Sequence, residues 1–224
     1  PLGSAFPSAG LFPLEKLSRS LSRGMRALDP ARVVADLSPG NAELRRLIAL
    51  RYRIDGLRIS ADDIVVTDGA MEGLNLCLQA VTRPGDAVVI DSPTFYGALQ
   101  ALERLHLRAI EVPTDPVSGI DLQALATVLK RQRPKACWLM PSFQNPLGSL
   151  MPEASKAALV QLLSEHEVPL IEDDVYGELY YASQRPRSAK SFDTEGLVMH
   201  CASFSKTLAP GYRIGWTAAG RYAK

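Results

Sequence analysis

Residues 197–216, LVMHCASFSKTLAPGYRIGW, decide the fold of this chain. The apolar stretch Leu197 to Ala202 predicts a buried strand. Lys206 follows that strand among hydroxyl side chains, and Arg213 comes seven positions later. A lysine amine can form a Schiff base with an aldehyde, and serine and arginine side chains suit a phosphate dianion. The stretch therefore predicts a strand that leads into a ligand site, with a solvated lysine in a polar loop as the plainer alternative.

Outward from this stretch, short apolar runs alternate with amphipathic segments from residue 63 onward. Seven runs predict strands, at residues 64–67, 87–90, 108–112, 135–140, 168–171, 197–202 and 214–218. Apolar residues spaced i, i+3, i+4 and i+7 predict the intervening helices, at residues 74–81, 98–105, 122–129 and 159–163. This alternation predicts an α/β fold with a mostly parallel, doubly wound sheet and helices on both faces.

The composition limits the function classes. The formal net charge is +1, so we expect no nucleic-acid face within these 224 residues. The three cysteines are widely spaced in apolar runs, which predicts reduced thiols in a cytoplasmic protein and neither disulfides nor a metal site. No uncharged apolar run reaches about 18 residues, so we expect no membrane span.

The domain organisation follows from the change of pattern near residue 60. Residues 5–60 carry leucine spacings typical of helices and predict an N-terminal helical extension. Residues 61–224 predict one larger ligand-binding domain. Residues 1–4, PLGS, are typical of a cloning scar, and we expect the whole chain to be a fragment of a longer protein.

Polar motifs follow the predicted strands at their carboxyl ends, where open α/β sheets bind ligands. Residues 67–71, TDGAM, open a helix whose N-terminus favours phosphate, although Thr67 or Asp68 could simply cap it. Residues 91–97, DSPTFYG, offer an aromatic ring for stacking or for the core. Residues 145–148, NPLG, form a turn, and residues 172–174, EDD, place carboxylates after the fifth strand.

These motifs, in this order, resemble those of fold type I pyridoxal 5'-phosphate (PLP) proteins, the class I/II aminotransferases. The resemblance implies a seven-stranded large domain whose last strand is antiparallel, followed by a smaller C-terminal domain that this chain lacks. It also implies PLP held as an aldimine on Lys206. Burial and neighbouring positive charge should lower the pKa of this lysine.

The resemblance assigns further roles residue by residue. Asp173 would keep the pyridine nitrogen protonated, which makes the ring an electron sink, and Asp174 takes this role if the register slips by one. Asn145 and Tyr176 would donate to the phenolic oxygen. Phe95 would stack on the ring, with Tyr96 as the alternative.

The phosphate would be held by residues from two segments. They are the backbone of Ala70 and Met71 together with the side chains of Ser203, Ser205 and Arg213. For Arg213 the alternative is a surface ion pair, which its expected place on a central strand disfavours. Lys206, Asp173 and Tyr176 would carry the chemistry.

Two functions remain open from the sequence. Residues 91–100, 171–179 and 203–211 resemble MocR-type regulators of the GntR family, which join a winged-helix DNA-binding domain to an aminotransferase-like domain. This reading implies an amino-acid or amine effector, a homodimer, and DNA contact only through an N-terminal domain absent from this chain. The alternative is a free-standing aminotransferase acting on an amino acid and a 2-oxo acid. Transaminase chemistry is expected only in the full-length protein, because the family's carboxylate-binding arginine lies in the C-terminal domain.

Overall fold

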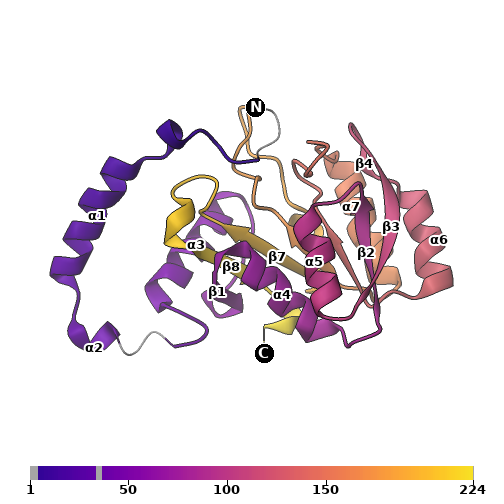
Figure 1. Cartoon of the computed structure of the whole chain (residues 1–224), viewed down its shortest axis with the longest axis horizontal. Coiled ribbons are helices and arrows are strands. Elements are labelled where there is room, and N and C mark those ends of the chain that lie inside the picture. The colour runs from indigo at the N-terminus through magenta and orange to yellow at the C-terminus, as the bar shows by residue number, and fades with distance from the viewer. Residues whose placement is uncertain (1–4, 34–36, 224) are drawn as a thin grey trace.

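A computed structural model describes residues 5–33 and 37–223. Within these residues eight strands form one sheet in the order β1-β8-β7-β6-β5-β2-β3-β4 (Figure 1). Their bounds are β1 Ile64–Asp68, β2 Ala87–Ser92, β3 Arg108–Asp115, β4 Gly119–Ile120, β5 Ala136–Leu139, β6 Leu170–Asp173, β7 Val198–Ser203 and β8 Ile214–Ala218. The predicted cloning scar at residues 1–4 lies outside the described residues.

The strand directions confirm the predicted sheet. Strands β3, β2, β5, β6 and β7 pair in parallel, and β8 runs antiparallel to β7 and β1. The sequence predicted seven strands, one fewer than the sheet has, because Gly119–Ile120 pairs antiparallel with the end of β3 as a further strand, β4. This strand has only two residues after a turn held by the Asp115 carboxylate, so it leaves no apolar run to detect.

Helices cover both faces of the sheet (Figure 1). Their bounds are α1 Leu14–Ala27, α2 Pro30–Val33, α3 Ala42–Ile54, α4 Gly69–Val81, α5 Tyr96–Arg104, α6 Leu122–Gln132 and α7 Glu153–Glu165. Short 3-10 turns are η1 Ala9–Leu11, η2 Ala61–Asp63, η3 Ala189–Phe192, η4 Pro210–Tyr212 and η5 Gly220–Tyr222. Helices α4 and α5 pack on one face, while α6, α7 and α3 pack on the other.

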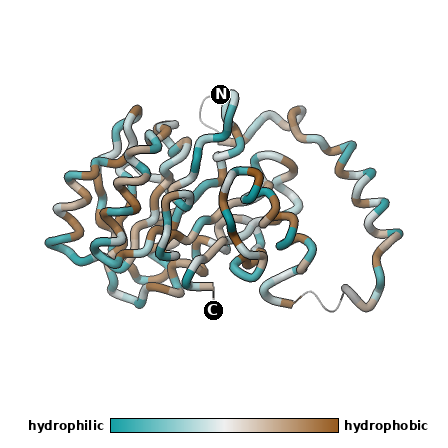
Figure 2. Tube along the Cα trace, turned by 180° about the vertical axis from the view of Figure 1, so that it is seen from behind, coloured by the Kyte–Doolittle hydropathy of each residue, from teal (hydrophilic) through white to brown (hydrophobic). Residues whose placement is uncertain are grey.

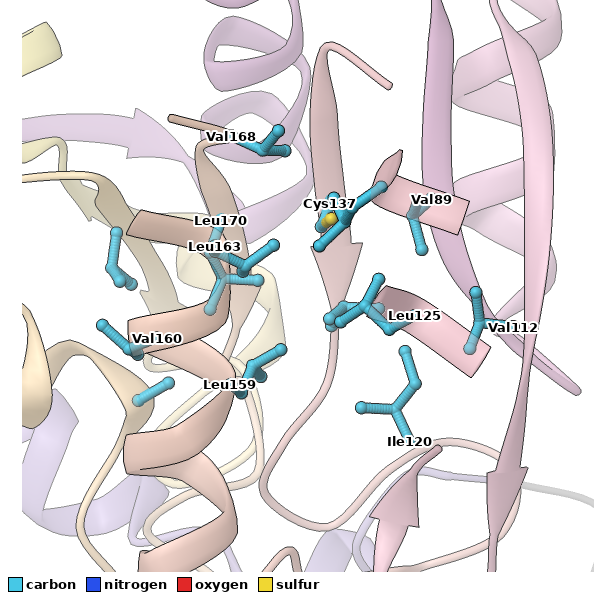
Figure 3. Close-up of a cluster of buried hydrophobic side chains, with 14 of the residues drawn as sticks. Val89, Val112, Ile120, Leu125, Cys137, Leu159, Val160, Leu163, Val168 and Leu170 are labelled. Carbon is cyan, nitrogen blue, oxygen red and sulfur yellow. The ribbon is translucent and has the colours of Figure 1, made fainter. Parts of the chain in front are cut away.

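Alternation along the strands produces these two layers, because successive strand side chains point to opposite faces. Val89 and Cys137 belong to the core beneath α6 and α7, where Leu125 and Leu159 meet them (Figure 3). Val88, the residue before Val89 on β2, points to the other face and belongs to the core beneath α4 and α5. The three cysteines are free thiols buried in these cores.

The predicted N-terminal helices are present. Helix α3 packs on β1 and β8 through Ile48 and Tyr52. Helix α1 stands apart from the body, buries none of its residues, and alternates hydrophobic with hydrophilic segments (Figures 1 and 2). Across the described ranges, none of the helices is long and apolar enough to cross a membrane.

Candidate functional site

A cavity of about 940 Å³ opens where the carboxyl ends of β6 and β7 meet the start of α4. Its volume is typical of small-molecule sites. The structure brings all ten predicted site residues to its wall. They are Ala70, Met71, Phe95, Asn145, Asp173, Tyr176, Ser203, Ser205, Lys206 and Arg213.

Asp173 is the most unusual group in this wall. It ends β6 and is buried. Its Oδ1 has no hydrogen-bond partner among the described residues. Burial raises the pKa of this carboxyl group to about 7. A buried acceptor without a donor is costly, so the site suits a ligand that brings a positively charged N–H.

Asp174 lies outside this cavity wall. Its Oδ2 is 3.0 Å from His200 Nε2 and 3.0 Å from an Arg185 guanidinium nitrogen. His200 in turn contacts the Tyr52 hydroxyl of α3 at 2.7 Å. Asp173 therefore faces the cavity on the α4 side of the sheet, whereas Asp174 faces the α3 side. The alternative register, with Asp174 in the cavity, does not occur.

Lys206 lies in the loop after β7 and lines the same cavity as Asp173. Its Nζ donates to the Ala5 carbonyl at 3.1 Å and lies 3.6 Å from the centroid of the Phe6 ring. The Tyr176 ring centroid is 5.4 Å from the same nitrogen. Burial lowers the pKa of Lys206, and the Asp173 carboxylate opposes that effect. The direction matches the prediction, but the expected contribution of neighbouring positive charge is wrong.

The start of α4 provides the anion-binding end of the cavity. The first N–H groups of a helix have no partner within the helix, so those of Ala70 and Met71 are available to an anion. Asp68 does not cap the helix, because its carboxylate pairs with Arg213 instead. Across the cavity, the buried Ser203 hydroxyl accepts from the Ser205 N–H at 3.4 Å.

The location of Arg213 corrects a prediction. It precedes β8 by one residue and adopts a left-handed conformation, with φ of 54°, at the end of η4. Its Nε is 3.1 Å from Asp68 Oδ1, and the two side chains are 52% and 70% exposed. The strand starts at Ile214 as predicted, so Arg213 lies just before it at the end of the turn Pro210–Tyr212, where it forms the surface ion pair and also lines the cavity.

The aromatic and amide residues line the cavity from two other loops. Phe95 directly precedes α5 and is half-buried, while Tyr96 is 69% exposed. Their ring centroids lie 4.8 Å apart. A Cβ on Gly97 would come within 2.5 Å of the Phe95 ring, so glycine is needed beneath it. Asn145 is half-buried in the loop after β5.

Sequence reasoning missed other residues of the wall. Gln144 directly precedes the NPLG motif of residues 145–148, but only the structure shows that it is buried in the cavity wall. Ala5 and Phe6 reach the site from the other end of the chain, and no local pattern in the sequence announces that contact.

Residues 32–222 match the family Aminotransferase class I and II, and the chain belongs to this family. The uncharacterized HTH-type transcriptional regulator YdcR of Escherichia coli K12 is 55% identical over 224 residues, which is 100% of this chain and 48% of that protein. The 2-aminoadipate transaminase of Thermus thermophilus is 34% identical over 218 residues, covering 95% of this chain and 53% of the enzyme.

A crystal structure of the α-aminoadipate aminotransferase LysN of Thermus thermophilus, complexed with N-(5'-phosphopyridoxyl)-L-leucine, superimposes with a TM-score of 0.86. It is 33% identical, and the match covers 99% of this chain and 56% of that one. These matches confirm the predicted family and fold, and PLP as the cofactor that the family implies. The chain spans about half the length of the curated relatives it matches.

Proposed function

We propose that this chain is the PLP-binding, aminotransferase-like part of a MocR/GntR-type transcriptional regulator. The observation that carries PLP binding is the buried Asp173 Oδ1, which has no partner in the described chain and faces the cavity that Lys206 also lines. A protonated pyridine nitrogen would supply the missing donor. Residues suited to the other groups of PLP line the same wall, so the fit does not depend on one side chain.

Each residue has a separate task in this proposal. Lys206 would hold the cofactor covalently through Nζ, and its lowered pKa favours the neutral amine that this requires. Asp173 would keep a proton on the ring nitrogen, and Asn145 and Tyr176 would donate to the phenolic oxygen. PLP supplies an electron sink when bound. In an enzyme, Lys206 Nζ would also move the proton at the substrate carbon.

The phosphate would bind at the start of α4. The donors come from three segments: the Ala70 and Met71 N–H groups at the start of α4, the Ser203 and Ser205 hydroxyls at the end of β7, and the Arg213 guanidinium after η4. Phe95 would cover one face of the ring and exclude water there.

The regulator assignment draws support from the relatives. HTH-type transcriptional regulators of Escherichia coli match at 55% and 41% identity over nearly the whole chain. We infer an amino-acid or amine effector, a homodimer in the cytoplasm, and DNA contact through a separate winged-helix module. A free-standing aminotransferase is the second candidate, because enzymes match at 34% and 32% identity.

Reductive trapping tests the PLP site. The chain is incubated with PLP, reduced with borohydride and digested, and mass spectrometry should find the phosphopyridoxyl group on Lys206. Lys206→Ala should lose the adduct, while Lys16→Ala, at a residue exposed on α1, should keep it. No adduct on Lys206, or equal labelling of many lysines, contradicts the proposal.

The two candidate functions are separated with the full-length parent protein. A regulator should bind its own promoter fragment in a gel-shift assay, and an amino acid with PLP should change that binding. Turnover of amino acid and 2-oxo acid without DNA binding would favour the enzyme.

A further inference from the structure

Gln144 is buried in the cavity wall, at 2% exposure, and both ends of its amide are bonded. Its Nε2 donates to the Pro93 carbonyl at 2.7 Å, and its Oε1 accepts from the Leu147 N–H at 2.8 Å. Asn145 is the next residue along the chain, and Phe95 lies two residues after Pro93. One side chain thus joins the loop that carries the amide donor to the loop that carries the stacking ring.

We propose that Gln144 is a positioning residue that fixes the separation of Phe95 and Asn145 across the cofactor cavity. This inference rests on the proposed function. The bond from Gln144 Nε2 to Pro93 O is called the cross-loop bond below.

The cross-loop bond continues the sheet beyond its backbone pairing. Strands β2 and β5 pair in parallel only as far as Ile90 and Trp138. Beyond this pair, the carboxylate of Asp91, the residue after Ile90, accepts from the N–H of Met140, two residues after Trp138, at 3.0 Å. The cross-loop bond lies further along, where the chain has left β2 on one side and β5 on the other and both segments are loops. Proline offers a carbonyl but no N–H, so Pro93 can take part only as an acceptor.

The loop that carries Asn145 is rigid enough to transmit a change at Gln144. The Gln144 N–H donates to the Ser149 carbonyl at 3.0 Å, which closes the loop on itself. Below it, the fully buried Lys156 donates to Ser142 Oγ at 2.7 Å. With the loop held at Ser142 and Ser149, a displaced Gln144 shifts its neighbour Asn145.

The variant Gln144→Glu removes the cross-loop bond but preserves the packing of the side chain, so it tests the positioning role by itself. The carboxylate keeps the size of the side chain and can still accept from Leu147, but it cannot donate to Pro93 and repels that carbonyl. Gln144→Met removes both bonds without adding charge, and serves if the glutamate variant does not fold. Gln100→Glu, on the exposed face of α5, makes the same charge change away from the site.

The first measurement is hydrogen exchange on the chain without PLP. Peptides covering residues 93–99 and 145–151 should exchange faster in both Gln144 variants and remain unchanged in Gln100→Glu. Unchanged exchange in either loop overturns the proposal. This result does not depend on cofactor binding, so it decides the role of the cross-loop bond even if the wild-type chain binds no PLP and the proposed function fails.

The second measurement is PLP binding, followed by the visible absorption of the bound cofactor. Losing one buried hydrogen bond should weaken PLP affinity about 10-fold and shift the absorption maximum, because Phe95 and Asn145 no longer hold their spacing. Gln100→Glu should match the wild type. Faster exchange with unchanged affinity and spectrum would leave Gln144 a merely structural role and overturn the inference.

Discussion

Replacing Asp173 with asparagine should stabilise the cofactor-free chain, although it damages the proposed site. Burial raises the pKa of Asp173 from its ordinary 3.8 to about 7. Between about pH 4 and about pH 7 the folded chain holds a proton that the unfolded chain has released, so the free energy of unfolding falls as pH rises. The difference corresponds to about 4 kcal/mol at pH 8. Asparagine keeps the shape and carries no charge, so it escapes this penalty.

Urea unfolding between pH 5.5 and pH 8.5 measures the effect. The stability advantage of Asp173→Asn over the wild type should grow by about 2 kcal/mol from pH 5.5 to pH 7 and then level off. Asp115→Asn is the control, because hydrogen bonds in its exposed turn lower the pKa of that carboxyl group. Its variant should differ from the wild type by a constant amount over this range.

A flat difference between Asp173→Asn and the wild type would refute the reasoning, since it would mean that the Asp173 carboxylate ionises without cost. The same variant should lose most of its affinity for PLP, because a neutral amide cannot hold a charged pyridine nitrogen. Stability gained together with affinity lost would mark a residue retained for binding.

Two further predictions concern stability alone. Gly215→Ala should destabilise the chain by about 3 kcal/mol in urea unfolding, because the new Cβ would overlap the backbone at the start of α4. Gly211→Ala is the control, because a Cβ at that position would have no atom within 4 Å. Equal stability of the two variants would contradict this account. Tyr52→Phe should cost about 2 kcal/mol, because its hydroxyl accepts from Trp216 Nε1 at 2.9 Å in the core. The matched variant Tyr181→Phe, at a fully exposed tyrosine, should change stability by less than about 0.5 kcal/mol, and a similar small effect at Tyr52 would exclude a stabilising network there.

Much of the fold was predictable because the central strands β2, β5, β6, β7 and β8 are buried on both faces and therefore form nearly continuous apolar runs. The cavity was predictable for a related reason: parallel strands bring their carboxyl ends to one edge, so motifs far apart in sequence converge. Gly119–Ile120 was missed because two residues form no pattern.

Other features depend on tertiary contacts that local sequence does not encode. The side of the sheet that Asp173 faces follows from its strand register, and only the structure shows Asp174 bonded to His200 instead. Arg213 comes directly before the strand, and its ion pair with Asp68 depends on how the turn after β7 brings it back to the start of α4. The contact of Phe6 with Lys206 joins the two ends of the chain.

The ion pair between Arg213 and Asp68 makes phosphate binding an exchange of partners. An incoming phosphate would displace a carboxylate that is already bonded, and Asp68, which is 70% exposed, would return to solvent. The arginine therefore contributes only the difference between two ion pairs, which is small at an exposed position. Selectivity for the phosphate must therefore come from donors that are not already paired with a carboxylate. These are the first N–H groups of α4 and the serine hydroxyls. A compound that offers only an anionic group should bind weakly, and one that also engages Lys206 and Asp173 should be selected.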